Sequence, residues 1–273
     1  MMIRLPAIVA TSLLLVPGAA MATAADTRAN QATNAVERID PDTTEFELAT
    51  GADYSVGKYG QLVDTKVWSI PVDLKFRSNG LRLEASLPYV VMTGPGQMVG
   101  GVIVTDPGST ATVKRSGLGD LNLTAGYLLN HEAGALPAFE LSGSAKLPTA
   151  KTTIGTGKAD FSATISAYKS LGPTTMLFGS VGYSWLGSPA AYQLRNGITA
   201  SGGLNLRPSE ATNLGASLSY REPVAAGLKG QAVVSPYMTY RINKRFGLTL
   251  YGMAGLNDAS PRLGAGLRLS LFN

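Results

Sequence analysis

The sequence predicts an all-β fold, a transmembrane antiparallel up-and-down β-barrel of about 12 strands, from three observations. From residue 43 onward, apolar side chains recur at every second position, which is the period of a β-strand. The alternating runs are about 10–14 residues long, twice the globular average, and a tilted strand needs about 9–11 residues to cross a membrane. The polar positions carry glycine, serine, threonine and charges of both signs, which suit a wet interior.

The N-terminal residues predict export. Arg4 is the only charged side chain among the first 25 residues, and it precedes an apolar run over 5–16 and small residues at Ala20, Ala22 and Ala24. This layout is typical of a secretory signal peptide over residues 1–24, because the apolar run is shorter than the about 20 residues of a membrane-spanning helix. Residues 25–42 are polar and without periodicity, which indicates a flexible periplasmic leader. The barrel is predicted over 43–273.

Counting the period-two runs in order gives the individual strands. The alternation is clearest over 81–91 and 263–271. Five connections are short and rich in turn residues, whereas the intervening ones are longer, up to the segment 94–117. An even number of strands places both termini on the short-turn, periplasmic side. The predicted strands cover residues 43–56, 63–77, 81–93, 118–130, 136–147, 158–170, 174–187, 194–206, 212–222, 228–241, 246–257 and 261–272.

A soluble β-sandwich would show the same alternation, so the choice of a membrane barrel depends on more than periodicity. Aromatic residues fall on the apolar phase near strand ends, as Tyr54, Trp68, Tyr183 and Trp185 do. An aromatic girdle at a membrane interface requires this placement. We therefore expect a protein of the bacterial cell outer membrane, with lipid, lipopolysaccharide and the barrel-assembly machinery as partners.

The charged residues on the polar phase are the candidate lumen-lining residues. The acidic ones come from the first five strands, and the last five strands contribute only arginines. Two interpretations follow: an acidic arc facing a basic arc across the bore, or ion pairs between neighbouring strands that fill the interior. Asp53 shares this phase. The candidates are Glu45, Glu47, Asp73, Lys75, Arg82, Glu84, Glu140, Lys146, Arg195, Arg221, Arg241 and Arg268.

The longest connection contains an apolar stretch over 98–104. We expect it to fold into the mouth of the barrel as a constriction or a landing site for hydrophobic solutes. The alternative is a long hairpin that extends the strands beyond the membrane. Basic residues on the same loop side would be attracted to lipopolysaccharide phosphates or would form a solvated rim. These are Lys58, Lys114, Arg115, Lys151 and Lys229.

Catalytic, metal and cofactor sites are not expected. The chain has no cysteine and one histidine, which excludes thiolate metal sites and leaves few routes to a catalytic triad. His131 falls in a predicted short turn. The sequence Gly155-Thr156-Gly157-Lys158 lacks the first glycine and the following helix of a phosphate-binding loop. We expect no enzyme activity and no nucleic-acid partner.

Seven stretches carry a resemblance to a known family. They are 90–96 (VVMTGPG), 116–127 (SGLGDLNLTAGY), 145–150 (AKLPTA), 155–161 (GTGKADF), 168–172 (YKSLG), 177–186 (LFGSVGYSWL) and 260–269 (SPRLGAGLRL). In this order they resemble the outer-membrane barrel family named for the MetA pathway of phenol degradation. The resemblance implies a channel or transporter for small, aromatic or other hydrophobic solutes. A closed structural or surface-interaction barrel without transport is the alternative.

One departure from the family pattern concerns assembly. Members typically end in an aromatic residue on the lipid-facing phase, which the assembly machinery recognises. Here Asn273 occupies that place and Phe272 falls on the lumen phase, so assembly is less efficient or Phe272 serves after a one-residue shift.

We predict that Asn273→Phe raises the yield of folded protein in the outer membrane, because it restores a terminal aromatic residue on the lipid-facing phase. The measurement is the folded fraction of the membrane-inserted protein, separated from the unfolded form by its faster migration in unheated gels. An unchanged yield would show that the native C-terminus is recognised as efficiently.

Overall fold

The computed structural model describes residues 44–95, 97–99, 102–104, 110–190 and 193–273, with only the backbone described at 97–99 and 102–104. The predicted signal peptide and leader lie outside these residues. Among the described residues, no helix is long and apolar enough to cross a membrane.

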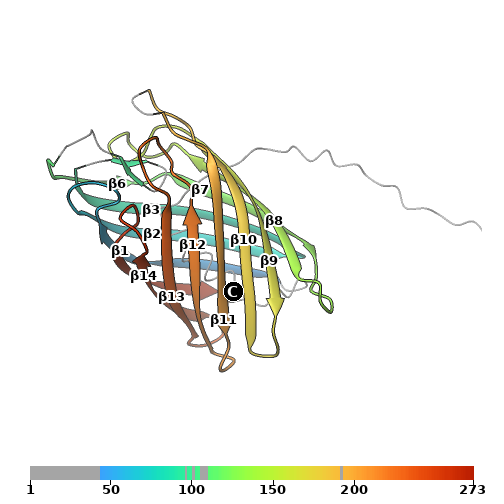
Figure 1. Cartoon of the computed structure of the whole chain (residues 1–273). Helices are drawn as coiled ribbons and strands as arrows, with labels where there is room; N and C mark the ends of the chain where they lie inside the picture. Colours follow the sequence, from blue (N-terminus) through green and yellow to red (C-terminus); the bar gives the residue numbers. More distant parts are fainter. Residues whose placement is uncertain (1–43, 96, 100–101, 105–109, 191–192) are drawn as a thin grey trace, which may run out of the picture.

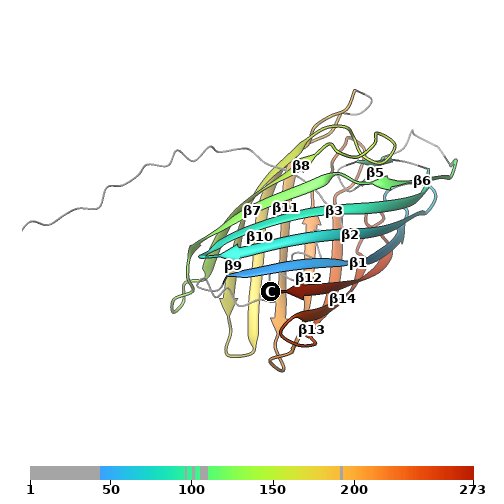
Figure 2. The same cartoon turned by 180° about the vertical axis from the view of Figure 1, so that it is seen from behind.

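The strands form a closed antiparallel barrel, as the alternation predicts (Figures 1 and 2). Each strand of the wall pairs with its neighbours in sequence, and β1 pairs with the last strand to close the ring. Twelve strands form this wall, and β6 is an extra strand that continues it beyond β7. The strands are β1 (Glu45–Gly57), β2 (Thr65–Ser78), β3 (Leu81–Gly94), β6 (Val113–Leu118), β7 (Leu121–Asn130), β8 (Ala138–Leu147), β9 (Asp160–Ser170), β10 (Thr175–Trp185), β11 (Gly197–Leu206), β12 (Thr212–Arg221), β13 (Gln231–Arg241), β14 (Phe246–Gly255) and β15 (Leu263–Phe272).

The longest connection contains two more short strands. β4 (Gln97–Val99) and β5 (Val102–Val104) pair only with each other. The expectation that residues 98–104 enter the mouth concerns side chains outside the described part of the chain, so it stays a prediction.

The break between β6 and β7 has a local cause. β3 pairs with β7 over Leu81–Ser86 and with β6 over Tyr89–Gly94, and the register shifts by one residue between the two. Pro88 of β3 lies at the break and has no N–H to donate, while its carbonyl accepts a hydrogen bond from the Gly119 N–H at 2.7 Å. Asp120, at the break, continues the inward phase of β7 and is 9% exposed.

The two faces of the wall differ as the alternation predicts. The outer face carries large apolar side chains that are more than half exposed, such as Trp68 and Val181. Such an apolar outer surface is typical of a barrel that faces lipid. Near the ends of the strands that lead into the longer loops, Tyr54 packs on Trp68 with ring centroids 4.8 Å apart. On β10, the rings of Tyr183 and Trp185 pack edge to face, with their centroids 5.0 Å apart. This arrangement fits an aromatic girdle at a membrane interface.

Short turns gather at one end of the barrel, which we call the turn end, and longer connections at the other, the loop end (Figure 1). Asn79 and Gly80 link β2 to β3 with φ of 50° and 77°, the left-handed pair of a tight hairpin turn. In the turn after β7, hydrogen bonds from Lys169 Nζ and the Ser170 N–H lower the pKa of Glu132 to about 2. His131, in the same turn, is exposed.

The C-terminus closes the barrel without a register shift. Phe272 pairs with Glu47 of β1, points inward and is 7% exposed, with the Arg241 guanidinium 3.5 Å from its ring centroid. Asn273 follows the strand, and its Oδ1 accepts a hydrogen bond from the Phe46 N–H at 2.8 Å. Phe272 therefore occupies the inward phase that the sequence predicts for it.

Candidate functional site: the barrel interior

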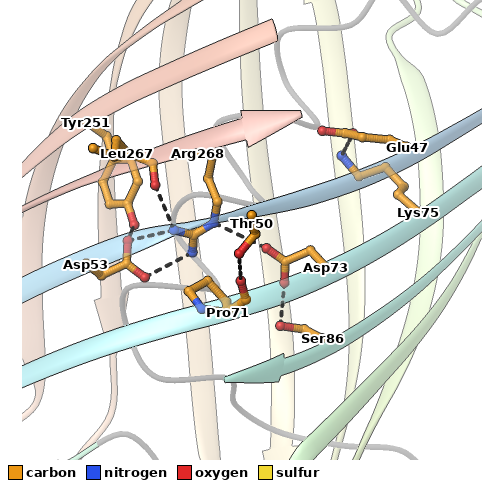
Figure 3. A network of polar contacts seen from close by, with 10 residues as sticks. All are labelled: Glu47, Thr50, Asp53, Pro71, Asp73, Lys75, Ser86, Tyr251, Leu267 and Arg268. Atoms are coloured by element: carbon orange, nitrogen blue, oxygen red, sulfur yellow. Dashed lines mark hydrogen bonds and ion pairs between the residues drawn. The ribbon is translucent and has the colours of Figure 1, made fainter. Parts of the chain in front are cut away.

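The interior holds a buried ionic network centred on Arg268 of β15 (Figure 3). Its guanidinium forms two hydrogen bonds with the Asp53 carboxylate of β1, at 2.7 and 3.0 Å. The Nε atom donates to Asp73 of β2 at 3.2 Å, and Asp73 also accepts from the Ser86 hydroxyl of β3. Arg268 is 4% exposed, so a planar cation with fixed donors joins two carboxylates away from bulk solvent.

A second ion pair lies one step along the same wall. Glu47 of β1 and Lys75 of β2 are direct cross-strand partners, and the Lys75 Nζ–Glu47 Oε2 distance is 3.0 Å. Both side chains are less than 10% exposed. Cross-strand pairing at one register position is the shortest link that a sheet provides between opposite charges.

Arg82 of β3 reaches across a whole strand to find its partner. It contacts Glu84 Oε1 at 2.9 Å on its own strand and Glu140 Oε1 of β8 at 2.6 Å, although β7 lies between β3 and β8. The residue of β7 that pairs with Arg82 is Gly126. A Cβ atom there would lie 3.0 Å from Arg82 Nη2 and 3.1 Å from Glu140 Oε1, so glycine leaves room for the contact.

The same arrangement recurs across β15. Tyr251 of β14 and Asp53 of β1 both pair with Gly266 of β15, and the Tyr251 hydroxyl donates to the Asp53 carboxylate over it. A side chain at position 266 would overlap both groups. An inward-facing glycine thus links the strands on either side of it through their side chains.

These contacts decide between the two interpretations of the charged residues. The carboxylates are paired with cations on the same part of the wall, as in the second interpretation, and these ion pairs fill one side of the barrel. At the turn end, Glu45 pairs with Arg241 at 3.3 Å. Arg221 is 7% exposed at the loop end of β12. Arg195 departs from its expected place, because it precedes β11 and is exposed.

Lys146 holds the loop end together. It is 4% exposed, and its Nζ atom lies 2.6 Å from Asp160 Oδ2, 3.3 Å from Asp120 Oδ2 and 3.2 Å from Thr156 Oγ1. Asp160 also accepts a hydrogen bond from the Gly187 N–H, in the connection after β10. One buried cation therefore joins β8, β9, the β6–β7 break and two loops. Sequence reasoning proposed Lys146 but missed both aspartates, although each lies on the polar phase of a predicted strand, 118–130 or 158–170.

The loop 148–159, after β8, folds into the mouth. Ala150 and Ile154 pack on the inward side chains of Val67, Val90 and Met92, with Met92 only 1% exposed. Tyr59, from the connection after β1, completes this apolar cluster. The loop is fixed at its base by the Ala150 N–H, which donates to Asp120 Oδ1 at 3.0 Å. This loop therefore narrows the mouth above β2 and β3.

The strands β7 to β12 present a different inner surface, which we call the hydroxyl wall. Most serine and threonine side chains of these strands point inward, are half-buried and adjoin one another in register, whereas Ser184 and Ser217 are buried. Four of them form a row across four strands, with the Ser180 and Ser201 hydroxyl oxygens 2.7 Å apart. The hydroxyl wall consists of Thr124, Ser142, Ser144, Ser162, Thr164, Ser166, Ser180, Thr199, Ser201 and Ser219.

Among the described residues, no group of three or more His, Asp or Glu side chains is arranged to hold a metal ion.

Comparison with known proteins gives a family and a fold. The model of the family described as "Putative MetA-pathway of phenol degradation" matches residues 43–271. The sequence matches no curated protein.

Several solved structures have a similar shape. The NanC porin is 8% identical, covering 83% of this chain and 98% of its own, with a TM-score of 0.52. The translocator domain of the autotransporter NalP from Neisseria meningitidis is 12% identical, covering 91% and 95%, with a TM-score of 0.51. At such identities the similarity concerns the fold.

We predict that Gly126→Val lowers the free energy of unfolding by about 2 kcal/mol or more, because the new side chain separates Arg82 from Glu140 and leaves buried charges apart. The control is Gly143→Val on β8, where the nearest neighbour of a Cβ atom is 3.8 Å away. Reversible urea unfolding in lipid vesicles measures both. Equal stabilities of the two variants would contradict the role given to Gly126.

We also predict that Lys146→Met lowers the free energy of unfolding by about 3 kcal/mol, because Asp120 and Asp160 then face each other without their cation. Lys151→Met, an exposed lysine in the same loop, should change it by less than about 0.5 kcal/mol. If the two substitutions had the same effect in urea unfolding, Lys146 would not be the link between the loops and the wall.

Proposed function

The chain belongs to the MetA-pathway family of phenol degradation and lies in the bacterial outer membrane, and from this premise we propose that it is a channel for small solutes. The observation that supports transport most directly is the partial exposure of the hydroxyl wall inside a closed barrel. Side chains that a packed interior would bury remain accessible there, so the bore keeps free space along that wall.

The size of the barrel limits the solute. A closed sheet of 12 strands has a backbone radius of roughly 12 Å, and inward side chains from opposite strands reduce the free width of the bore to less than about 10 Å. The ionic network and the mouth cluster narrow the bore further. Small molecules are therefore proposed as the solutes, and the family description favours aromatic or other hydrophobic ones.

The remaining expectations from the sequence complete this proposal. Residues 1–24 direct export, residues 25–42 form a leader, and the barrel-assembly machinery inserts the barrel. Four exposed lysines at the loop end, Lys58, Lys114, Lys151 and Lys229, suit contact with lipopolysaccharide phosphates. No chemical reaction is proposed.

A closed structural barrel without transport is the second candidate. The observation that favours it is the filling of one side of the interior by ion pairs together with the apolar cluster in the mouth. The two candidates differ in one measurable property, which is the passage of ions and small solutes.

We predict that the purified, folded protein produces reproducible conductance steps of fixed size in a planar lipid bilayer. The free space along the hydroxyl wall should admit hydrated ions. Flotation of the same preparation with lipid vesicles confirms insertion. Inserted protein that gives no conductance steps and also takes up no small neutral solute into vesicles would contradict the channel and favour the closed barrel.

A further inference from the structure

The interior of the barrel is divided lengthwise into two unlike halves. The inward residues of β13, β14, β15, β1, β2 and β3 are packed against one another, which we call the packed wall. Examples are Val233 at 0% exposed, Met92 at 1%, Arg268 at 4% and Tyr237 at 5%. The ten serine and threonine residues of the hydroxyl wall are half-buried instead, although Ser184, Asn205 and Ser217 of the same strands are 5% exposed or less. The side chains of the hydroxyl wall are therefore more accessible from the bore than those of the packed wall.

The chemistry of the two halves differs as sharply as their packing. The packed wall contains the ionic clusters around Arg268 and Lys75, and it also contains Arg82, whose partner Glu140 lies on β8. On β9 to β12, by contrast, every inward position between Asp160 and Arg221, both at the loop end, carries an uncharged residue. The part of the interior that remains open is the part without fixed charge.

We propose that solutes pass along the hydroxyl wall and that this path selects small uncharged molecules carrying hydrogen-bonding groups. The inference rests on the proposed channel function and specifies its substrate class. The packed wall then acts as the support that keeps the opposite half open.

The selectivity follows from what each wall offers a solute. A hydroxyl both donates and accepts hydrogen bonds, so the row of Ser166, Ser180, Ser201 and Ser219 can replace the water that a neutral solute loses. An ion in the same narrow path loses more hydration and, beyond Asp160 and Arg221 at the loop end, finds no opposite charge on β9 to β12 to compensate it. At the turn end of this wall, Tyr168 and Phe178 are cross-strand partners, and their inward rings offer an apolar surface to the body of the solute.

Substituting neighbouring residues of β10 tests the path. Ser180→Trp places a large ring on the hydroxyl wall, whereas Val181→Trp places the same ring on the outside of the same strand, where Val181 is 55% exposed. Swelling of protein-containing vesicles in erythritol measures the uptake of a neutral polyol. We expect Ser180→Trp to reduce the swelling rate at least fivefold and Val181→Trp to leave it within twofold of the wild type. Migration in unheated gels confirms that both variants are folded.

Two further measurements test the selectivity. Vesicles should take up erythritol at least fivefold faster than threonate, an anion of similar size. Ser201→Asp should shift the reversal potential in a salt gradient toward cation selectivity, whereas Ser201→Asn, of the same size and uncharged, should not. This second pair tests the path even if Ser180→Trp fails to fold.

The outcomes separate the two proposals. Wild-type protein that is inserted but takes up no solute would overturn the channel itself. If the wild type takes up erythritol while Ser180→Trp takes it up at the same rate, the path does not follow the hydroxyl wall. Equal rates for threonate and erythritol would overturn the selection of uncharged solutes.

Discussion

A charge that points into the interior of a narrow barrel must be compensated by a neighbour, and this constraint organises the structure. Burying an unpaired ion costs several kcal/mol, whereas a buried pair with good geometry can offset much of that cost. Most neighbours on the inner face are fixed by strand register, and the nearest opposite charge is often two strands away. Arg82 and Glu140 meet because Gly126 between them has no side chain, and Tyr251 meets Asp53 over Gly266 for the same reason. Glycine on the inner face thus extends the reach of its neighbours by one strand.

The pairing of long charged side chains fills one side of the barrel interior more than the other. Where long side chains reach across glycines, they fill the space in front of several strands, and the ionic clusters gather on β1, β2, β3 and β15 with their partners. The strands opposite carry short hydroxyl side chains that cannot reach across the bore. A barrel filled from one side remains open on the other. The asymmetry is therefore a consequence of where long and short inward residues fall along the chain.

The sequence predicts those features that depend on local alternation. The 12 wall strands, the inward phase of Phe272 and the outward aromatic residues all follow from the period of two, because this alternation is a property of each strand by itself. The partner of an inward side chain depends instead on the register between two strands, which the sequence of one strand does not determine. The pairing of Arg82 with Glu140 and the contacts of Lys146 with Asp120 and Asp160 are of this kind. The break at Pro88 also escaped prediction, because its effect falls on residues 118–120 of another segment.

At the loop end, too, buried charges are compensated by neighbouring charges of opposite sign. Lys146 lies between Asp120 and Asp160, and Arg221 is close enough to act electrostatically on Asp160, so two cations and two carboxylates share this region. Because their charges cancel, the cluster presents little net field to a solute at the mouth. Its contacts go to loops and strand ends, which gives the cluster a mechanical role in holding the loop 148–159 over β2 and β3. With the charges of this cluster cancelled and most other ionic side chains packed on β1, β2, β3 and β15, a molecule passing along β9 to β12 meets hydroxyl groups and aromatic rings.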